Sequence, residues 1–287
     1  MKAFDDYFLA RPHLDEIQFY RVPSEMAQTA VYEIANEAES AEPSLQKSDI
    51  EVGFRFLAFN FKKATIVHHP SFREAIYHLL DMDKLKTALE PEGFLEASSY
   101  FPWKSKAQEK EPWKIVSLLE EAGYAGETLT VYALDRKSAI KQGEIFQEEA
   151  QKYGISLELK TYNLDQYYDP HLEEADLLFM GEVASTDYHL SFLGAFLNKA
   201  LIFNRFLSGS QMAKLNLFFE KIKQAPDREQ REKLIEETET YIKRENLFIY
   251  LFHPIKNRVF HPMIRDIEFE SFGYADFKRM WIKHGRG

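Results

Sequence analysis

The stretch Glu51–Leu89, EVGFRFLAFNFKKATIVHHPSFREAIYHLLDMDKLKTAL, places an apolar run directly before a helix pattern. The apolar run 54–61 ends at the lysine pair 62–63, which predicts a strand followed by a polar turn. Apolar residues then recur at helical spacing over 72–89, and Ser71 is in position to be the N-cap of that helix. A strand that leads into a helix favours an α/β domain.

Strands and helices continue to alternate along the rest of the chain, as in an α/β fold. Apolar runs bounded by Gly and polar residues predict strands at 129–134, 155–162, 176–183 and 247–252. Helical patterns cover 113–122, 137–153, 211–224 and 228–245, and the first two are closed by Gly123 and Gly154.

Composition excludes several classes of function. The formal net charge of -10 argues against this chain gripping nucleic acid by itself, because phosphate binding needs clustered Lys and Arg. The absence of Cys excludes disulfides, zinc-thiolate sites and cysteine nucleophiles. The most apolar stretch, 189–203, is shorter than a membrane span and is interrupted by Asn198 and Lys199, so we expect no membrane insertion.

The chain carries no GxSxG, Walker, GxGxxG or HExxH motif, and its histidines lack metal-ligand spacing. We therefore expect no catalysis, no cofactor and no metal. A Ser/His/Asp triad is a spatial arrangement that a sequence does not reveal, so an enzyme on a similar scaffold stays the alternative.

The opening stretch resembles the start of the second lobe in the oligopeptide/nickel-type solute-binding proteins of ABC transporters, known as family 5. That family has the approximate pattern YLAFN-T-KK, then VRQAI, then DRDKL. The positions that match it are Phe59, Asn60, Lys62, Lys63, Arg73, Ala75, Ile76, Asp81, Asp83, Lys84 and Leu85. Two further blocks, 4–23 and 118–124, resemble the family's stretches around RPYLDEI and LLxEAGY.

The resemblance implies an α/β fold of the two-lobed periplasmic-binding-protein type (type II). In the family, the block that matches 4–23 follows most of the first lobe, so we expect the first lobe to be incomplete in this chain. The expected organisation is a partial lobe I at 1–50, an α/β lobe II at 51–245, and a return to lobe I at 246–287. Ligand binding in the cleft would close the lobes about a hinge, which we expect near 48–53 and 244–248.

The C-terminal block 271–282, SFGYADFKRMWI, resembles the ending of SgrR-type transcription regulators. These carry an N-terminal winged-helix DNA-binding domain fused to a family 5 domain, and they act in the cytoplasm. The sequence thus predicts the ligand-sensing domain of such a cytoplasmic regulator, with DNA contacted only through a further N-terminal domain. The alternative is the substrate-binding component of a peptide-type ABC transporter, anchored outside the cytoplasm and partnered by an ABC permease.

The resemblance also points to the ligand site. Where the family has an aromatic residue and, three places later, an acid that often meets the ligand's amino group, this chain has Glu182 and Ser185. An acid returns only at Asp187, which departs from the family's pattern for binding a peptide's amino group, and the small solute is expected to be peptide or sugar-like. The predicted ligand-binding residues are Tyr100, Phe101, Trp103, Glu182, Ser185, Asp187 and Arg205.

Overall fold

The computed structural model describes residues 2–3, 5–6, 11–18, 45–89, 93–184, 187–260, 263–268 and 276–283. Its contacts divide the chain into two units, Met1–Glu51 with Ile255–Gly287, and Val52–Pro254. The chain passes from one unit to the other inside the first predicted hinge segment, and again after Pro254, later than the second. The assignment of these units to the two lobes of a clamp stays a prediction.

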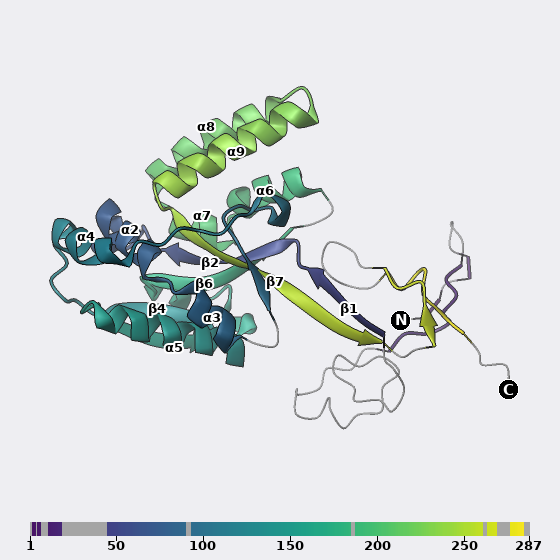
Figure 1. The fold of residues 1–287 in the computed structure, drawn as a ribbon. Helices are drawn as coiled ribbons and strands as arrows, with labels where there is room; N and C mark the ends of the chain where they lie inside the picture. The colour runs from purple at the N-terminus through teal and green to yellow at the C-terminus, as the bar shows by residue number, and fades with distance from the viewer. Residues whose placement is uncertain are drawn as a thin grey trace. The chain divides into compact units, whose positions relative to one another are not determined.

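The larger unit is built on a mixed sheet with β2 (Gly53–Phe59) near its centre (Figure 1). Within this unit the strand order is β7-β2-β6-β4-β5, and β3 also pairs with β7. β2 is antiparallel to both of its neighbours, whereas β6, β4 and β5 are parallel to one another. The other strands are β3 (Phe94–Glu96), β4 (Leu129–Leu134), β5 (Leu157–Tyr162), β6 (Leu177–Val183) and β7 (Phe248–Phe260).

Helices cover the sheet of the larger unit. α5 packs on β4 and β5, α7 packs on β2, and α8 and α9 form an antiparallel pair (Figure 1). The helices are α2 (Pro70–Leu79), α3 (Met82–Ala88), α4 (Ile115–Ala122), α5 (Lys137–Lys152), α6 (Tyr188–Leu197), α7 (Ile202–Phe206), α8 (Gly209–Gln224) and α9 (Arg228–Arg244). Short 3-10 turns lie at Ile66–His68, Pro102–Lys104, Pro112–Lys114, Leu164–Gln166 and Pro170–Glu174.

The helix predicted over 72–89 is in fact two helices. α2 begins at Pro70, which suits the first helical position because proline's missing N–H needs no partner there, and His69 rather than Ser71 is the N-cap. The chain leaves the helix at Leu80, and the Asp81 carboxylate accepts a hydrogen bond from the Lys84 amide at 2.9 Å. Because this side chain caps a new helix, α3, the apolar periodicity continues across a break in the backbone.

Several of the residues that match the family pattern hold element ends together. The buried Arg73 donates hydrogen bonds to the carbonyls of Val67 and His68 and to those of Glu245 and Asn246 after α9. Burial lowers the pKa of Arg73 to about 10. The match at Arg73 therefore reflects a structural role and not a contact with the ligand.

Asn60 and Lys63 tie the end of β2 to the segment that leads into β6. The Asn60 side-chain amide donates to the carbonyls of Glu173 and Ala175, both at 2.9 Å. Lys63 pairs with the buried carboxylate of Asp176 at 2.7 Å. These contacts set where β6 begins, and so where its far end lies.

The smaller unit contains β1 (Leu45–Ile50), which is antiparallel to residues 255–260 of β7. The first part of β7 belongs to the larger unit because it pairs with β2 and β3 there. A two-stranded ladder joins β8 (Ile264–Arg265) and β9 (Trp281–Ile282). A small core of Phe260, Ile264, Ile267 and Met280 supports this unit. Among the described residues, no helix combines the length and apolar character that crossing a membrane requires.

Candidate functional site

One face of the sheet in the larger unit is aromatic. Phe54 and Phe56 of β2 lie among Phe203 of α7 and the β7 residues Phe248 and Tyr250, with ring centroids 4.5–6.4 Å apart. Side chains alternate between the two faces of a strand, so residues directly opposite each other in a ladder share a face. We call this surface the aromatic face.

Glu182 lies on the aromatic face, since it is directly opposite Phe54 in the ladder between β2 and β6. Within the described part of the chain its carboxyl group makes no hydrogen bond and no ion pair. Glu182 is partly exposed, and burial raises its pKa from 4.5 to about 7, because the carboxylate loses part of its solvation and no described donor compensates it. A carboxylate without a hydrogen-bond donor lowers the stability of the fold, and groups with such shifted pKa values concentrate at functional sites.

The charge of Glu182 acts on two tyrosines. The Tyr100 side chain is 1% exposed, and its buried hydroxyl has no hydrogen-bond partner in the part of the chain that the structure describes. Burial raises the pKa of Tyr100 well above its usual value, and the charge of Glu182 raises it further. Burial and the same carboxylate raise the pKa of Tyr167 to about 12. Both phenols are thus neutral groups close to the carboxyl of Glu182.

Tyr100 belongs to a segment, Ser98–Ser105, that we call the aromatic loop. The buried Glu239 of α9 holds this loop, accepting hydrogen bonds from the Ser99 hydroxyl at 3.0 Å, the Tyr100 amide at 2.6 Å and the Tyr250 hydroxyl at 3.0 Å. Burial raises the pKa of Glu239, although these donors oppose the effect. The carboxylate therefore positions Tyr100 through its backbone.

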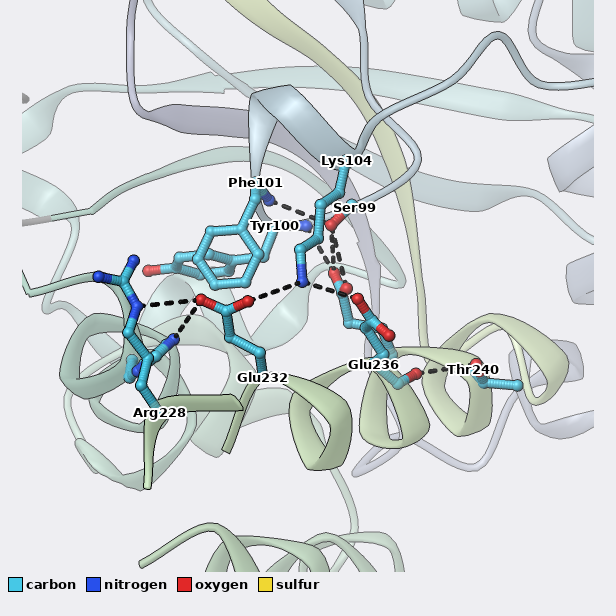
Figure 2. A network of polar contacts seen from close by, with 10 residues as sticks. Ser99, Tyr100, Phe101, Lys104, Arg228, Glu232, Glu236 and Thr240 are labelled. Atoms are coloured by element: carbon cyan, nitrogen blue, oxygen red, sulfur yellow. Dashed lines mark hydrogen bonds and ion pairs between the residues drawn. The ribbon is translucent and has the colours of Figure 1, made fainter. Parts of the chain in front are cut away.

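A second set of contacts holds the outer end of the aromatic loop. Figure 2 shows Lys104 reaching α9, where it pairs with Glu236 at 2.7 Å and Glu232 at 3.8 Å. Arg228 pairs with Glu232 from the other side at 3.1 Å. The hydroxyl of Ser105 lies 2.8 Å from Nε2 of the buried His253 of β7. The loop is thus fixed at both ends to elements of the same unit.

The other predicted residues of the loop differ in exposure. Phe101 is 2% exposed and stacks on Trp103, which is 56% exposed, with ring centroids 5.2 Å apart. Trp103 also meets Tyr188 at the start of α6 edge-on, at 4.8 Å. Phe101 is therefore part of the core, whereas Trp103 presents an aromatic surface to solvent.

The remaining predicted residues lie elsewhere. The exposed Asp187 is the N-cap of α6 and accepts hydrogen bonds from the amides of His189 and Leu190, at 3.1 and 3.0 Å. Arg205 is 8% exposed, and its guanidinium donates to the carbonyls of Tyr167 and Asp169. Ser185 lies outside the described residues, so its ligand-binding role stays a prediction. The contacts indicate that Asp187 caps α6 and that Arg205 holds the loop after β5.

Tyr167 is a site residue that the sequence did not single out. It follows the 3-10 turn Leu164–Gln166 after β5, in the polar run NLDQYYD. Arg205 holds it by a hydrogen bond to its carbonyl at 2.5 Å and by a contact between guanidinium and ring at 5.9 Å. No local pattern predicts that contact, because the two residues are 38 positions apart. The described residues contain no group of three His, Asp or Glu side chains able to hold a metal ion.

The fold and this site place the chain among solute-binding proteins. The sequence model of the bacterial extracellular solute-binding proteins, family 5 Middle, matches residues 1–203, and the chain belongs to this family. The predicted family and the predicted α/β fold are thus confirmed. Members of the family bind solutes rather than transform them, which agrees with the prediction of a binding module instead of an enzyme.

Individual relatives are similar at low identity. An uncharacterised Bacillus subtilis (strain 168) protein, YhjP, is 22% identical over 98% of this chain and 48% of its own length. The oligopeptide-binding protein AppA from Bacillus subtilis, in complex with a nonapeptide, is 16% identical over 99% of this chain and 63% of that one, with a TM-score of 0.78. A dipeptide-binding protein from Pseudoalteromonas sp. SM9913, in complex with Met-Leu, is 19% identical over 83% of this chain and 50% of that one, with a TM-score of 0.69. The chain spans about half the length of the curated relative that it matches.

Proposed function

We propose that this chain is the solute-binding part of a substrate-binding protein of a peptide-type ABC transporter. The observation that carries the proposal is the family match over residues 1–203. Structures of the same fold, in complex with a nonapeptide and with the dipeptide Met-Leu, favour a peptide over a sugar as the solute. The proposed mechanism is closure of two lobes about the solute, which stabilises the closed form through contacts that the open form lacks.

Within the larger unit, the surface proposed to meet the solute runs from the exposed ring of Trp103 to the carboxyl group of Glu182. An aromatic ring offers stacking area without demanding a particular side chain, which suits a binder of varied solutes. The partner of the loaded protein would be an ABC permease, and its location would be outside the cytoplasm, anchored to the membrane.

The competing hypothesis is the cytoplasmic SgrR-type regulator. It rests on the C-terminal block 271–282, of which residues 271–275 lie outside the described part of the chain. In the described part, Trp281 donates a hydrogen bond to Asp266 at 2.7 Å, a contact that suits either hypothesis. The coding sequence upstream of Met1 distinguishes them: a lipoprotein signal with a Cys supports the transporter component, and a winged-helix domain supports the regulator.

The binding function itself is testable with a mixture of tri- to pentapeptides and a mixture of oligosaccharides of similar mass. The protein is incubated with each mixture, freed of unbound solute and analysed by native mass spectrometry. We expect retention of peptides, and a loss of retention on Trp103→Ala. Retention of oligosaccharides alone would overturn the peptide assignment, and turnover of a retained solute would overturn the binding-protein assignment.

A further inference from the structure

Two polar groups without partners meet on the aromatic face. The carboxyl of Glu182 has no hydrogen bond or ion pair within the described residues, and neither has the hydroxyl of Tyr100, in a side chain that is 1% exposed. Buried polar groups in native proteins are almost always hydrogen-bonded. The buried hydroxyl of Tyr100 and the partly exposed carboxyl of Glu182 both lie beside Phe54, and they therefore indicate that a partner from outside the chain completes this site.

Resting on the proposed solute-binding function, we propose that Glu182, Tyr100 and Tyr167 form a subsite for one positively charged nitrogen of the solute, an ammonium or guanidinium group. The acid here is not at the family's usual acidic position, which is Ser185 in this chain. The subsite is instead formed by Glu182, the acid on β6 that stands where the family has an aromatic residue.

A positive partner is indicated because no described cation neutralises Glu182. On β2, Arg55 is opposite Gly181, so its side chain lies over that glycine on the other face of the sheet. On α7, the guanidinium of Arg205 is occupied by the carbonyls of Tyr167 and Asp169 and by Glu173. The carboxylates of Glu182 and Glu173 would repel an anionic group.

The charges on the other neighbouring elements lead to the same conclusion. On the aromatic loop, Lys104 is paired with Glu236 and Glu232 of α9. At the start of α6, Asp187 is committed to two backbone amides, and its charge would also favour a cation. Burial lowers the pKa of His189, which keeps this α6 residue neutral near pH 7.

The walls of the subsite also suit a cation. Phe54 is directly opposite Glu182, and the Tyr100 ring meets the Phe54 ring edge-on at 5.2 Å. Aromatic rings attract cations through the negative charge of their faces. Phenol oxygens such as that of Tyr167 accept hydrogen bonds from N–H donors.

Binding of a cation at Glu182 should also release a proton. Burial raises the pKa of Glu182 to about 7, so near neutral pH a large fraction of the molecules carry a proton there. A cation binds the carboxylate and lowers its pKa, and that proton leaves to solvent. The affinity for a cation should therefore rise with pH, by up to about tenfold per pH unit below pH 7, and level off above it.

The first experiment uses the tripeptide Ala-Lys-Ala and the same tripeptide with both amino groups acetylated, titrated calorimetrically at pH 6, 7 and 8. We expect the wild-type protein to bind the free peptide at least tenfold more tightly than the acetylated one at pH 8, and less selectively at pH 6. At pH 7 the heats should differ between phosphate and Tris, because these buffers take up the released proton with different enthalpies. Glu182→Gln should bind both peptides alike, whereas Glu229→Gln, an exposed change on α9, should behave as wild type.

A second experiment does not depend on peptide binding. Ethylammonium chloride should raise the melting temperature of the wild-type protein above that in sodium chloride of equal ionic strength, at pH 8 but not at pH 5.5. The difference should vanish in Glu182→Gln and shrink in Tyr100→Phe. If wild-type protein binds both tripeptides equally, or ethylammonium acts alike on wild type and Glu182→Gln, the cation subsite is wrong. If ethylammonium acts as expected but no peptide binds, the subsite stands and the peptide assignment fails.

Discussion

Glu239 and Glu182 both reach the aromatic face of one sheet, and they differ in what meets them there. Glu239 comes from α9 and accepts hydrogen bonds from two hydroxyls and a backbone amide. Glu182 comes from β6, and no donor among the described residues meets it. Burial raises the pKa of both, but only at Glu239 do hydrogen bonds oppose that effect. A buried carboxyl group with hydrogen-bond donors supports structure, whereas a partly buried one without donors costs stability and is available to a ligand.

The largest expected effect is at Glu239. Glu239→Ala removes the acceptor for the Tyr100 amide and the Tyr250 hydroxyl and leaves both buried without a partner. We expect a loss of roughly 3 kcal/mol or more in the free energy of unfolding, measured by urea denaturation. Glu236→Ala on the same helix is the control, because its exposed pair with Lys104 should contribute about 1 kcal/mol or less. Equal losses in the two variants would contradict the anchoring role of Glu239.

The second change, Glu182→Gln, is expected to raise the free energy of unfolding at high pH. With a pKa of about 7 rather than 4.5, folded wild-type protein binds more protons at Glu182 than the unfolded chain does between these values. Its stability therefore falls as pH rises from about 4.5 to 7, by up to roughly 3 kcal/mol. Glu182→Gln lacks this penalty, so we expect it to be more stable than wild type at pH 8 and similar to wild type at pH 4.5, by urea denaturation at each pH. A variant that is less stable at pH 8 would show that Glu182 has a partner.

Two tyrosines sharpen the same contrast. Tyr250→Phe removes a donor to the buried Glu239 and should cost about 1–3 kcal/mol in the free energy of unfolding. Tyr100→Phe removes a buried hydroxyl that has no partner in the described part of the chain, so it should be neutral or slightly stabilising. Both changes delete the same atom from a buried ring, which makes them matched controls. A comparable cost for Tyr100→Phe would assign its hydroxyl a structural bond.

A smaller loss of stability than at Glu239 or Tyr250 is expected at Asp187. Asp187→Ala removes the acceptor for two amides at the start of α6 and should cost about 1 kcal/mol, whereas Asp187→Asn should retain most of the stability, since Asn is also a good N-cap. Thermal denaturation with and without a retained peptide measures both roles. A loss of peptide affinity in Asp187→Asn without a loss of stability would place Asp187 in the binding site rather than at the helix cap alone.

Local pattern accounts for most elements of the larger unit. The strands 129–134, 157–162 and 177–183 and the helices 137–152 and 228–244 lie within a few residues of the predicted ranges, because apolar periodicity and terminal glycines are local signals. The break between α2 and α3 was missed because the pattern of apolar residues continues through Asp81. A side chain that caps a helix interrupts the backbone without interrupting the amphipathic face.

The sequence by itself determined the family, the α/β class and the segments Tyr100–Trp103 and Glu182–Asp187 as places to look for a ligand. Tertiary structure alone decided which of their side chains lack partners. Arg205 donates hydrogen bonds to carbonyls of the loop after β5, Phe101 is buried, and the charge of Glu182 acts on Tyr100 and Tyr167. The physical reason is that burial and hydrogen-bond satisfaction depend on residues brought together from distant positions of the chain, as with Tyr100 and Glu182, which are 82 positions apart. The sequence shows which polar side chains are present, and only the packed structure shows which of them lack a hydrogen-bond partner.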